Sequence, residues 1–412
     1  MIHRFAVSNY HSIREEAVLD LRVPGTAPDL PRFRPSRARR DVRLPTVAVL
    51  MGPNGSGKTT LLRALTTMAR VAGMPFSSEE GSVPVKAVMP FASEPTLHEP
   101  TRFRLDVEAD WLAPGEDPQL FRYELAVGRD RSDPGRPFFR YESLSHYPRG
   151  RARRIVERED AGAPARISEE IVSALGLGAK GGRLQAIRDD TSVIGALALL
   201  NVPVAARANE WLQGVVAATN LLFAQTWTWP TQNVVRALGK NPALLSWARK
   251  HLATSDLGVR DVAVSEADAG ESDWRSVLFE HHGPVGPLPL LMQSGGTRRL
   301  FHLLPQLFIA LEKGVPAILD EVDADLHVDI VADLLDWFRS RETNPRAAQL
   351  LVTSHNVGLL DDLEKEELFI TEKSRDGATA VHGAQDVRGL RREARLYSKY
   401  RAGVLGGVPK LG

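Results

Sequence analysis

The sequence predicts an α/β fold in which a P-loop core carries an antiparallel β subdomain and a helical insertion. Three observations favour it. A glycine-rich loop stands between a short apolar run and a helical apolar pattern, strand-like alternation follows over residues 103–147, and helical spacing dominates residues 166–256. The length of 412 residues suits two or three subdomains.

Composition excludes several classes of protein. The net charge is +1, from 52 basic and 51 acidic residues, so overall charge does not indicate nucleic-acid binding. The absence of cysteine excludes disulfides, thiolate metal sites and cysteine nucleophiles. The N-terminus does not resemble a signal peptide, and no apolar run is long enough to span a bilayer. We therefore expect a soluble, cytoplasmic protein with no membrane segment of its own.

The N-terminal region predicts a hairpin followed by a loop. Residues 1–21 contain two alternating apolar runs separated by a turn at Asn9–Ser12. Residues 24–45 are rich in proline and arginine and are expected to form an exposed loop. Two interpretations of these arginines remain open, a solvated loop or a contact with nucleic acid or a partner.

The glycine-rich loop runs from Gly52 to Thr60 and matches the pattern G-x-x-x-x-G-K-[S/T]. The apolar run 46–50 before it suits a buried parallel strand, and apolar residues at helical spacing follow it. This context lets backbone N–H groups and a helix N-terminus bind phosphates. Lys58 is expected to reach the β- and γ-phosphates, and the Thr59 hydroxyl to ligate Mg²⁺. The residues expected to bind phosphate are Gly52, Asn54, Gly55, Ser56, Gly57, Lys58, Thr59 and Thr60.

Strands and then helices are predicted for the middle of the chain. Antiparallel strands are expected at 103–107, 121–127 and 138–147, and helices at 167–175, 191–201, 205–217 and 234–252, the last broken near Pro242. No motif residue falls within 166–256, so we expect this insertion to be dispensable for nucleotide binding and to serve assembly or partner contact. Strands are predicted again at 259–264 and 277–281.

The last third of the chain carries further candidate site residues. Ser294, Gly295 and Gly296 precede a predicted helix and form a possible second anion site. The apolar strand 317–319 leads into Asp320, which could hold Mg²⁺, and Glu321, which could orient or deprotonate a water. Another strand leads to His355, which could hydrogen-bond a γ-phosphate or be structural.

These motifs occur in an order that resembles the ABC-type ATPase superfamily, in its SMC and RecF-like branch. The resemblance implies that the glycine-rich loop is Walker A and that Asp320–Glu321 is Walker B. It implies that residues 293–297 are the signature motif, residues 322–327 the D-loop and His355 the switch histidine. It further implies that ATP is hydrolysed with Mg²⁺, with Lys58, Glu321 and His355 as catalytic residues.

A closer resemblance covers most of the chain. Five segments are similar to AAA_15/AAA_21-type ATPases, a group that includes the RloA, AbiL and AriA phage-defence proteins. They are Ser8–Ile13, the Ser-Gly-Gly-Thr-Arg signature, Asp320–His327, Thr353–Asn356 and the tail Tyr397–Pro409. This implies a homodimer or larger oligomer that sandwiches ATP, and a Toprim- or RloB-type effector nuclease as partner. An alternative is a RecF- or SMC-like DNA-repair ATPase that clamps DNA. A third interpretation, an ABC transporter subunit, is disfavoured by the helical insertion and the N-terminal hairpin.

The predicted domains are an ATPase lobe over 1–165, the helical insertion over 166–256, a second ATPase lobe over 257–386 and a basic tail over 387–412. The tail gathers five cations over a short helix-like run, at Arg391, Arg392, Arg395, Lys399 and Arg401. We interpret it either as an interaction element for an effector or DNA, or as a solvated helix.

Overall fold

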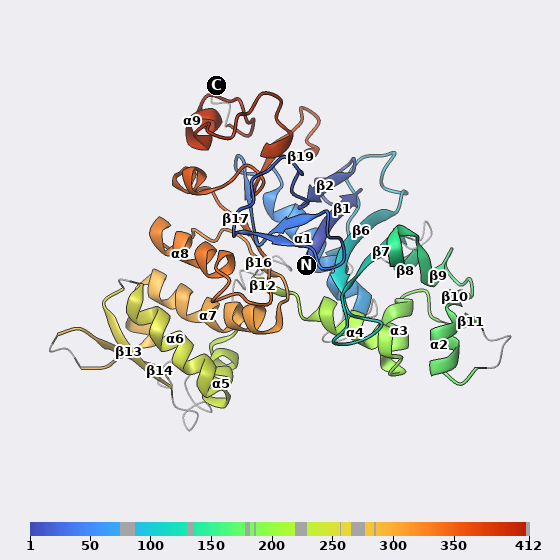
Figure 1. The fold of residues 1–412 in the computed structure, drawn as a ribbon, viewed down its shortest axis with the longest axis horizontal. Helices are drawn as coiled ribbons and strands as arrows, with labels where there is room; N and C mark the ends of the chain where they lie inside the picture. Colours follow the sequence, from blue (N-terminus) through green and yellow to red (C-terminus); the bar gives the residue numbers. More distant parts are fainter. Residues whose placement is uncertain are drawn as a thin grey trace.

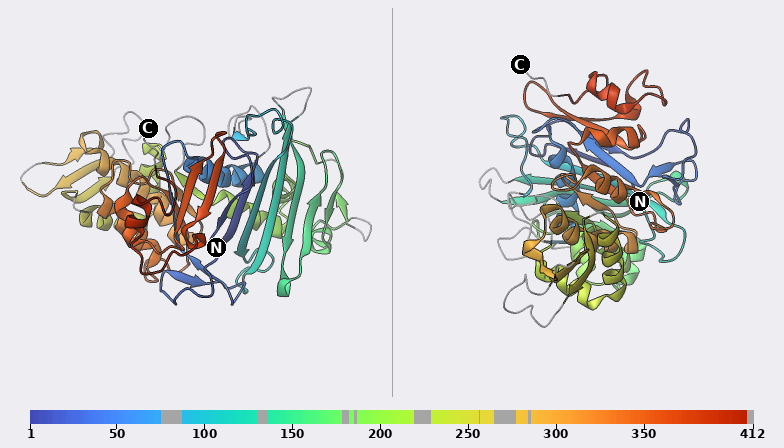
Figure 2. Two further views of the ribbon diagram at one scale, coloured as in Figure 1. Left: turned by 90° about the horizontal axis from the view of Figure 1, so that it is seen from above. Right: turned by 90° about the vertical axis from the view of Figure 1, so that its left-hand side faces the viewer.

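The computed structural model describes residues 1–74, 87–129, 136–177, 182–184, 187–218, 229–255, 257–264, 277–283 and 286–408. A central sheet divides the molecule, with antiparallel strands at one end and a helical region with a small sheet at the other (Figures 1 and 2). None of the helices in these ranges is long and apolar enough to cross a membrane.

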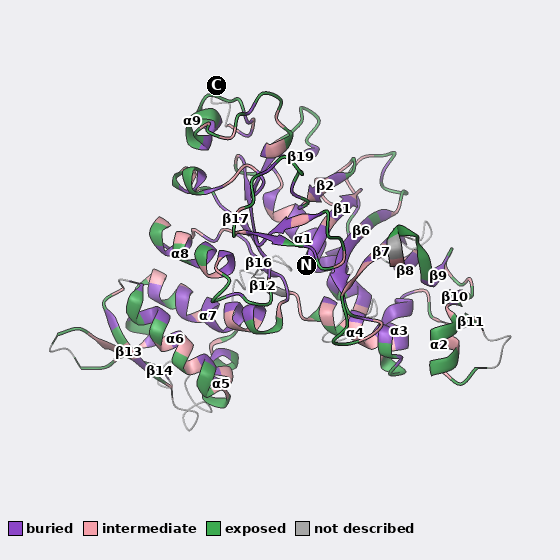
Figure 3. Cartoon of the chain, in the orientation of Figure 1, coloured by how far each residue is buried: buried purple, intermediate pink, exposed green. Residues whose placement is uncertain are grey.

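The central sheet has six strands and is parallel except at one edge. In sheet order the strands are β12 (Val216–Ala218), β16 (Ala317–Leu319), β17 (Leu350–Thr353), β5 (Val47–Met51), β18 (Leu368–Lys373) and β19 (Thr379–Gly383), the last antiparallel. All residues of β16, β17 and β5 are buried (Figure 3), as expected for parallel strands covered on both faces.

An antiparallel sheet of eight strands forms the other layer. In sheet order its strands are β11 (Arg183–Leu184), β10 (Ala165–Ile167), β9 (Arg153–Arg158), β8 (Pro137–His146), β7 (Gln119–Arg129), β6 (Thr101–Ala109), β1 (Ile2–Ser8) and β2 (Ala17–Asp20). The predicted N-terminal hairpin and the three predicted strands at 103–147 are confirmed as β1–β2 and as β6, β7 and β8.

Two hydrophobic cores lie on opposite faces of the parallel sheet. Helix α1 (Lys58–Gly73) contributes to the first core, between the two sheets, where Ala48 and Leu50 of β5 meet residues of β1, β6 and β7. Val47, Val49 and Met51 face the second core. The helices of the second core are α5 (Thr231–Lys240), α6 (Pro242–Thr254), α7 (Gly295–Lys313) and α8 (Val328–Arg339). Alternation along β5 thus joins the two cores.

The segment predicted as one helical insertion, 166–256, is divided between these cores. Its first helices, α2 (Glu169–Ala174), α3 (Val193–Leu199) and α4 (Pro203–Gln213), pack in the first core. β12 then becomes the edge strand of the central sheet, beside β16, and α5 and α6 join the second core. A linker in its place would remove a strand and core residues from both halves, so the segment is part of the fold. The expectation that nucleotide binding does not need it stays a prediction. The predicted break at Pro242 is confirmed, since Asn241 caps α6 there.

The arginine-rich stretch 24–45 is also more ordered than predicted. It contains the hairpin β3 (Phe33–Pro35) and β4 (Arg43–Pro45). Arg34 is buried and donates to the carbonyl oxygen of Arg339 at 3.2 Å, and Arg32 pairs with buried Glu367 at 3.0 Å. Because these arginines bind the rest of the chain, only part of the stretch is a solvated loop.

The remaining elements are a small third sheet, a terminal helix and several short 3-10 helices. They are the small sheet β13 (Val259–Val264), β14 (Val277–His281) and β15 (Leu288–Pro289), the terminal helix α9 (Leu396–Arg401), and the short 3-10 helices η2 (Pro148–Gly150), η3 (Leu290–Met292), η4 (Val357–Asp362) and η5 (Ala384–Asp386). Helix α7 is continuous from residue 295 to 313, with Pro305 in its interior.

Candidate functional site

The glycine-rich loop joins β5 to α1, and its glycines adopt backbone angles that other residues rarely adopt. Gly52 has φ 150° and Gly57 has φ 106°. A Cβ atom at Gly52 would lie 2.3 Å from the carbonyl oxygen of Thr371, and one at Gly57 would lie 2.2 Å from Thr379 Oγ1. Any side chain at either position would collide with β18 or β19. The loop is therefore a close-fitting backbone cradle, the form that binds phosphate.

Lys58 begins α1 and lies back across the loop. Its Nζ donates to the carbonyl oxygens of Gly52 at 2.8 Å and Pro53 at 3.0 Å, and lies 3.5 Å from His355 Nδ1. Burial lowers the pKa of Lys58, and the nearby carboxylates of Asp320 and other acids oppose that shift. A buried ammonium held by neutral carbonyls can exchange them for an anion at little cost.

A hydroxyl and a carboxylate meet beside Lys58. Asp320, which is buried, accepts a hydrogen bond from Thr59 Oγ1 at 2.9 Å and another from Thr353 Oγ1 at 2.6 Å. Among the described residues, no group of three or more His, Cys, Asp or Glu side chains could hold a metal. Mg²⁺ in phosphate-binding sites usually takes one or two protein oxygens and completes its shell with phosphate and water. Thr59 and Asp320 fit that donor set.

Glu321 occupies a strained position at the end of β16. Its φ is 49°, which places a non-glycine residue in the left-handed region. Its backbone N–H donates to Thr353 Oγ1 at 2.6 Å, and its carbonyl accepts from Arg299 Nη2 at 3.0 Å. These bonds hold the backbone, while the carboxylate is left to line the cleft above the glycine-rich loop. Strain of this kind is concentrated at functional sites.

His355 follows β17 and lines the same cleft. Its backbone N–H donates to Asp323 Oδ2 at 3.0 Å, which ties the turn after β16 to the turn after β17. The structure thus brings Lys58, Thr59, Asp320, Glu321 and His355 to one edge of the central sheet, where the carboxyl ends of neighbouring parallel strands meet.

The predicted second anion site lies at the start of α7. Ser294 caps the helix and accepts from the Thr297 N–H at 3.1 Å, and its own surface is exposed. A Cβ at Gly296 would lie 2.7 Å from the carbonyl oxygen of Asp325, so the start of α7 packs directly on the turn after Asp320–Glu321. Ser294, Gly295 and Gly296 do not line the cleft of Lys58 in the same chain.

The cleft over the loop has a volume of about 570 Å³. Six of the predicted phosphate-binding residues line it, whereas Gly52 and Ser56 do not; it is lined by Ser12, Asn54, Gly55, Gly57, Lys58, Thr59, Thr60, Glu321, His355 and Lys373. Sequence reasoning missed two of these. Ser12 lies in the predicted turn at residues 9–12 and was assigned no role at the site. Lys373 belongs to no motif, and it reaches the loop because β18 pairs with β5.

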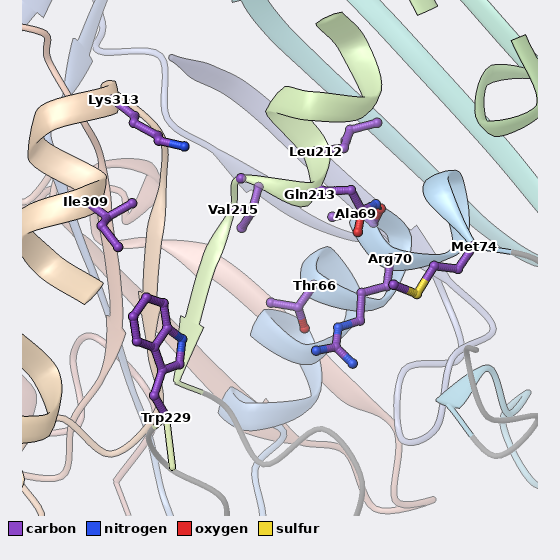
Figure 4. Close-up of a pocket in the computed structure, with 11 residues that line it drawn as sticks. Thr66, Ala69, Arg70, Met74, Leu212, Gln213, Val215, Trp229, Ile309 and Lys313 are labelled. Carbon is purple, nitrogen blue, oxygen red and sulfur yellow. The ribbon is translucent and has the colours of Figure 1, made fainter. Parts of the chain in front are cut away.

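A second cavity, of about 410 Å³, lies at the far end of α1 (Figure 4). Arg70 of α1 lies on one side, and Trp229 with Lys313 of α7 lies on the other. None of the described residues that line this cavity carries a carboxylate.

One solved structure supports the fold, and two further Smc heads match with lower TM-scores. An Smc head bound to the C-winged helix domain of ScpA is similar, with a TM-score of 0.51 and 14% identity over 92% of this chain and 97% of that one. An SMC head from Thermotoga maritima matches with 14% identity and a TM-score of 0.42, covering 93% of this chain and 98% of its own. An Smc head with an extended coiled coil, bound to the C-terminal domain of ScpA from Pyrococcus furiosus, matches with 15% identity and a TM-score of 0.45. The match covers 92% of this chain and 95% of that one.

No curated protein matches the chain. One family model does, over residues 47–361, which include the glycine-rich loop, the signature, Asp320–Glu321 and His355. That family is described as an AAA domain, putative AbiEii toxin, type IV toxin–antitoxin system. The match covers most of the chain, and the fold is similar to that of an Smc head. The chain therefore belongs to this AAA_21 family of ATPases.

Proposed function

We propose that the protein hydrolyses ATP in a Mg²⁺-dependent reaction at the cleft over the glycine-rich loop. The observation that carries this proposal is the convergence of Lys58, the Thr59–Asp320 pair at 2.9 Å, and Glu321 at the carboxyl edge of one sheet. Phosphoryl transfer depends mostly on positioning and on neutralising charge, and these residue types supply both.

Each residue has a distinct part in this proposal. Lys58 binds the β- and γ-phosphates, and Thr59 with Asp320 holds Mg²⁺, which neutralises phosphate charge when bound. Glu321 orients the attacking water and accepts its proton. His355 lies 3.5 Å from Lys58 and donates to the γ-phosphate.

The active unit is a homodimer or larger oligomer. Ser294 is exposed at the N-terminus of α7, and the signature lies outside its own chain's cleft. An exposed helix N-terminus suits the phosphates of a nucleotide held by another copy. We propose that Ser294, Gly295 and Gly296 of one protomer complete the site built by Lys58 of its partner.

The biological role we propose is anti-phage defence in the cytoplasm, with an abortive-infection-like outcome. The family description, a putative AbiEii toxin of a type IV toxin–antitoxin system, supports a role of this kind. In this proposal the ATPase senses infection and controls a Toprim- or RloB-type effector nuclease encoded nearby. The Smc-head fold favours a second candidate, a RecF- or SMC-like ATPase that clamps DNA.

Two measurements test these proposals. ATP binding and phosphate release by the wild-type protein and Lys58→Ala test the activity, and retained binding and turnover in the variant would contradict it. Co-purification of the neighbouring gene product, with and without ATP, tests the defence role. Strongly salt-dependent affinity for DNA by the protein alone, with no such complex, would favour the DNA-clamping alternative.

A further inference from the structure

Lys373 is the last residue of β18, and its side chain lines the same cleft as Lys58. β18 pairs with β5 in parallel, with Ile370 opposite Met51, so Lys373 extends past the point where the glycine-rich loop begins. Burial lowers its pKa. A second lysine beside a phosphate loop adds a point charge that the loop motif does not predict.

Strand order shows which end of the cleft Lys373 occupies. Glu321 follows β16, His355 follows β17, the glycine-rich loop follows β5, and Lys373 ends β18, and these four strands are consecutive in the sheet. The groups proposed for hydrolysis therefore lie on one side of the loop and Lys373 on the other. A nucleotide whose γ-phosphate faces Glu321 would direct its α-phosphate toward β18 if it lies along this order of strands.

Lys373 contacts its own turn, and that turn contacts the N-terminal region. Its Nζ donates to the carbonyl oxygen of Gly377 at 2.7 Å. Asp376 of the same turn forms an ion pair with Arg14. Ser12 Oγ lies 2.9 Å from Thr379 Oγ1 on β19, the residue paired with Lys373, and 3.3 Å from Thr60 Oγ1 on α1. Ser12, Thr60 and Lys373 thus gather at this end of the cleft.

We propose that Lys373 binds the α-phosphate of the nucleotide, with Ser12 and Thr60 beside it. The inference rests on the proposed ATPase function and adds a recognition element at the end of the cleft away from hydrolysis. It separates two kinds of contact. Lys373 binds a group that ATP and ADP share, whereas His355 lies where only the γ-phosphate of ATP would reach.

The test is calorimetric titration of Mg-ATP and Mg-ADP, in a Glu321→Gln background so that ATP is not consumed. Lys373→Met should weaken both nucleotides by a similar factor, about tenfold, the value of one hydrogen bond to a charged group. Lys373→Arg, which keeps the charge, should restore much of that affinity. Arg375→Met is the matched control, because Arg375 is an exposed cation on the same turn that does not line the cleft.

His355→Ala supplies the contrast and should weaken ATP but not ADP. Unchanged affinity in Lys373→Met, or a loss for ATP alone, would overturn the inference and leave the proposed ATPase intact. A wild-type protein that binds neither nucleotide would overturn the proposed function itself, and this inference with it.

Discussion

Lys58 and Arg158 are both buried cations, but the structure holds them in opposite ways. Lys58 donates to two backbone carbonyls at the edge of a cleft. Arg158, in the antiparallel sheet, pairs with Glu142 at 3.3 Å, donates to the carbonyl oxygen of Thr191 at 2.9 Å and lies over the ring of Phe139. The first arrangement leaves a cation able to bind a ligand. The second commits the cation to the fold.

Two carboxylates, Glu142 and Glu321, show the same difference between a charge bonded within the fold and a charge at the cleft. Glu142 is fully buried and accepts from Tyr123 Oη at 2.9 Å and from the N–H groups of Val193 and Ile194, at 2.6 and 3.1 Å, which begin α3. Burial raises the pKa of Glu142, and Arg158 opposes that shift. Within the part of the chain that the structure describes, the hydrogen bonds of Glu321 are made by its backbone. A charge whose side-chain bonds are all internal stabilises the chain, and one held by its backbone is available for chemistry.

The largest effect is expected at Glu321. Glu321→Gln keeps the side-chain shape but cannot accept a proton from water, so turnover should fall by roughly 10²–10⁴-fold. Nucleotide binding should survive, because the loop and Lys58 are unchanged. Phosphate release and nucleotide titration measure the two effects. Near-normal turnover would show that Glu321 is not the catalytic base and would remove its functional difference from Glu142.

Next in size is the removal of Arg158. Arg158→Met leaves Glu142 buried without its cation, which should lower the free energy of unfolding by roughly 3–5 kcal/mol. Arg104→Met is the matched control, because its pair with Glu124 lies on the same sheet and both side chains are partly exposed, at 35% and 28%. That change should cost about 0–1 kcal/mol. Equal losses in denaturant unfolding would show that burial does not set the value of these pairs.

Glu108 gives a pH test of a carboxylate committed to the fold. Burial raises its pKa, but hydrogen bonds from His3 and Ser36 and the ammonium of Met1 outweigh burial and lower the pKa to about 2. The unfolded carboxyl titrates near 4.5. Its contribution, about 3 kcal/mol, is therefore present above pH 4.5 and lost as pH falls toward 2.

Glu108→Gln should accordingly flatten the acid limb of stability between pH 5 and pH 3, as seen in denaturation midpoints. Glu16→Gln serves as control, because the Glu16 side chain is 48% exposed in its pair with Arg4. An unchanged acid limb in Glu108→Gln would show that the ionised carboxylate does not stabilise the fold.

The smallest effect on the isolated chain is expected in the basic tail. Arg392 bonds Glu364 at 2.8 Å and Glu366, whereas Arg391 and Arg395 are exposed. Reversing Arg391 and Arg395 to glutamate should leave ATP hydrolysis unchanged and weaken effector or DNA binding. Pull-down and salt-dependent DNA titration measure this. If both partners bind as before, the tail is a solvated surface.

Much of the fold followed from short-range patterns. Alternating residues predicted β1, β6, β7 and β8, and the apolar run before the glycine-rich loop predicted β5. The helices of 166–256 were predicted as elements but not as members of two cores. Their assignment depends on β12, a three-residue edge strand whose position is set by pairing with β16 rather than by its own pattern.

The candidate site divides in the same way. Residues within contiguous motifs, from Gly52 to Thr60 and at Asp320–Glu321, could be named from sequence because the spacing itself encodes the geometry. Ser12 and Lys373 could not, because they reach the cleft through strand pairing and a turn far away in the chain. Thr353 belongs to the segment 353–356 that carries the family resemblance, but its hydrogen bonds to Asp320 and to the Glu321 backbone were not predicted.

The most direct test of the central claim is ATP hydrolysis in a mixture of two inactive variants. Lys58→Ala lacks a working loop, and Ser294→Arg lacks a working signature. If one protomer's signature completes its partner's cleft, a mixed dimer contains one intact site, and mixing should restore a substantial part of wild-type turnover. We expect ATP turnover in the mixture although neither variant is active alone. A mixture as inactive as its components, although the two variants associate, would contradict it.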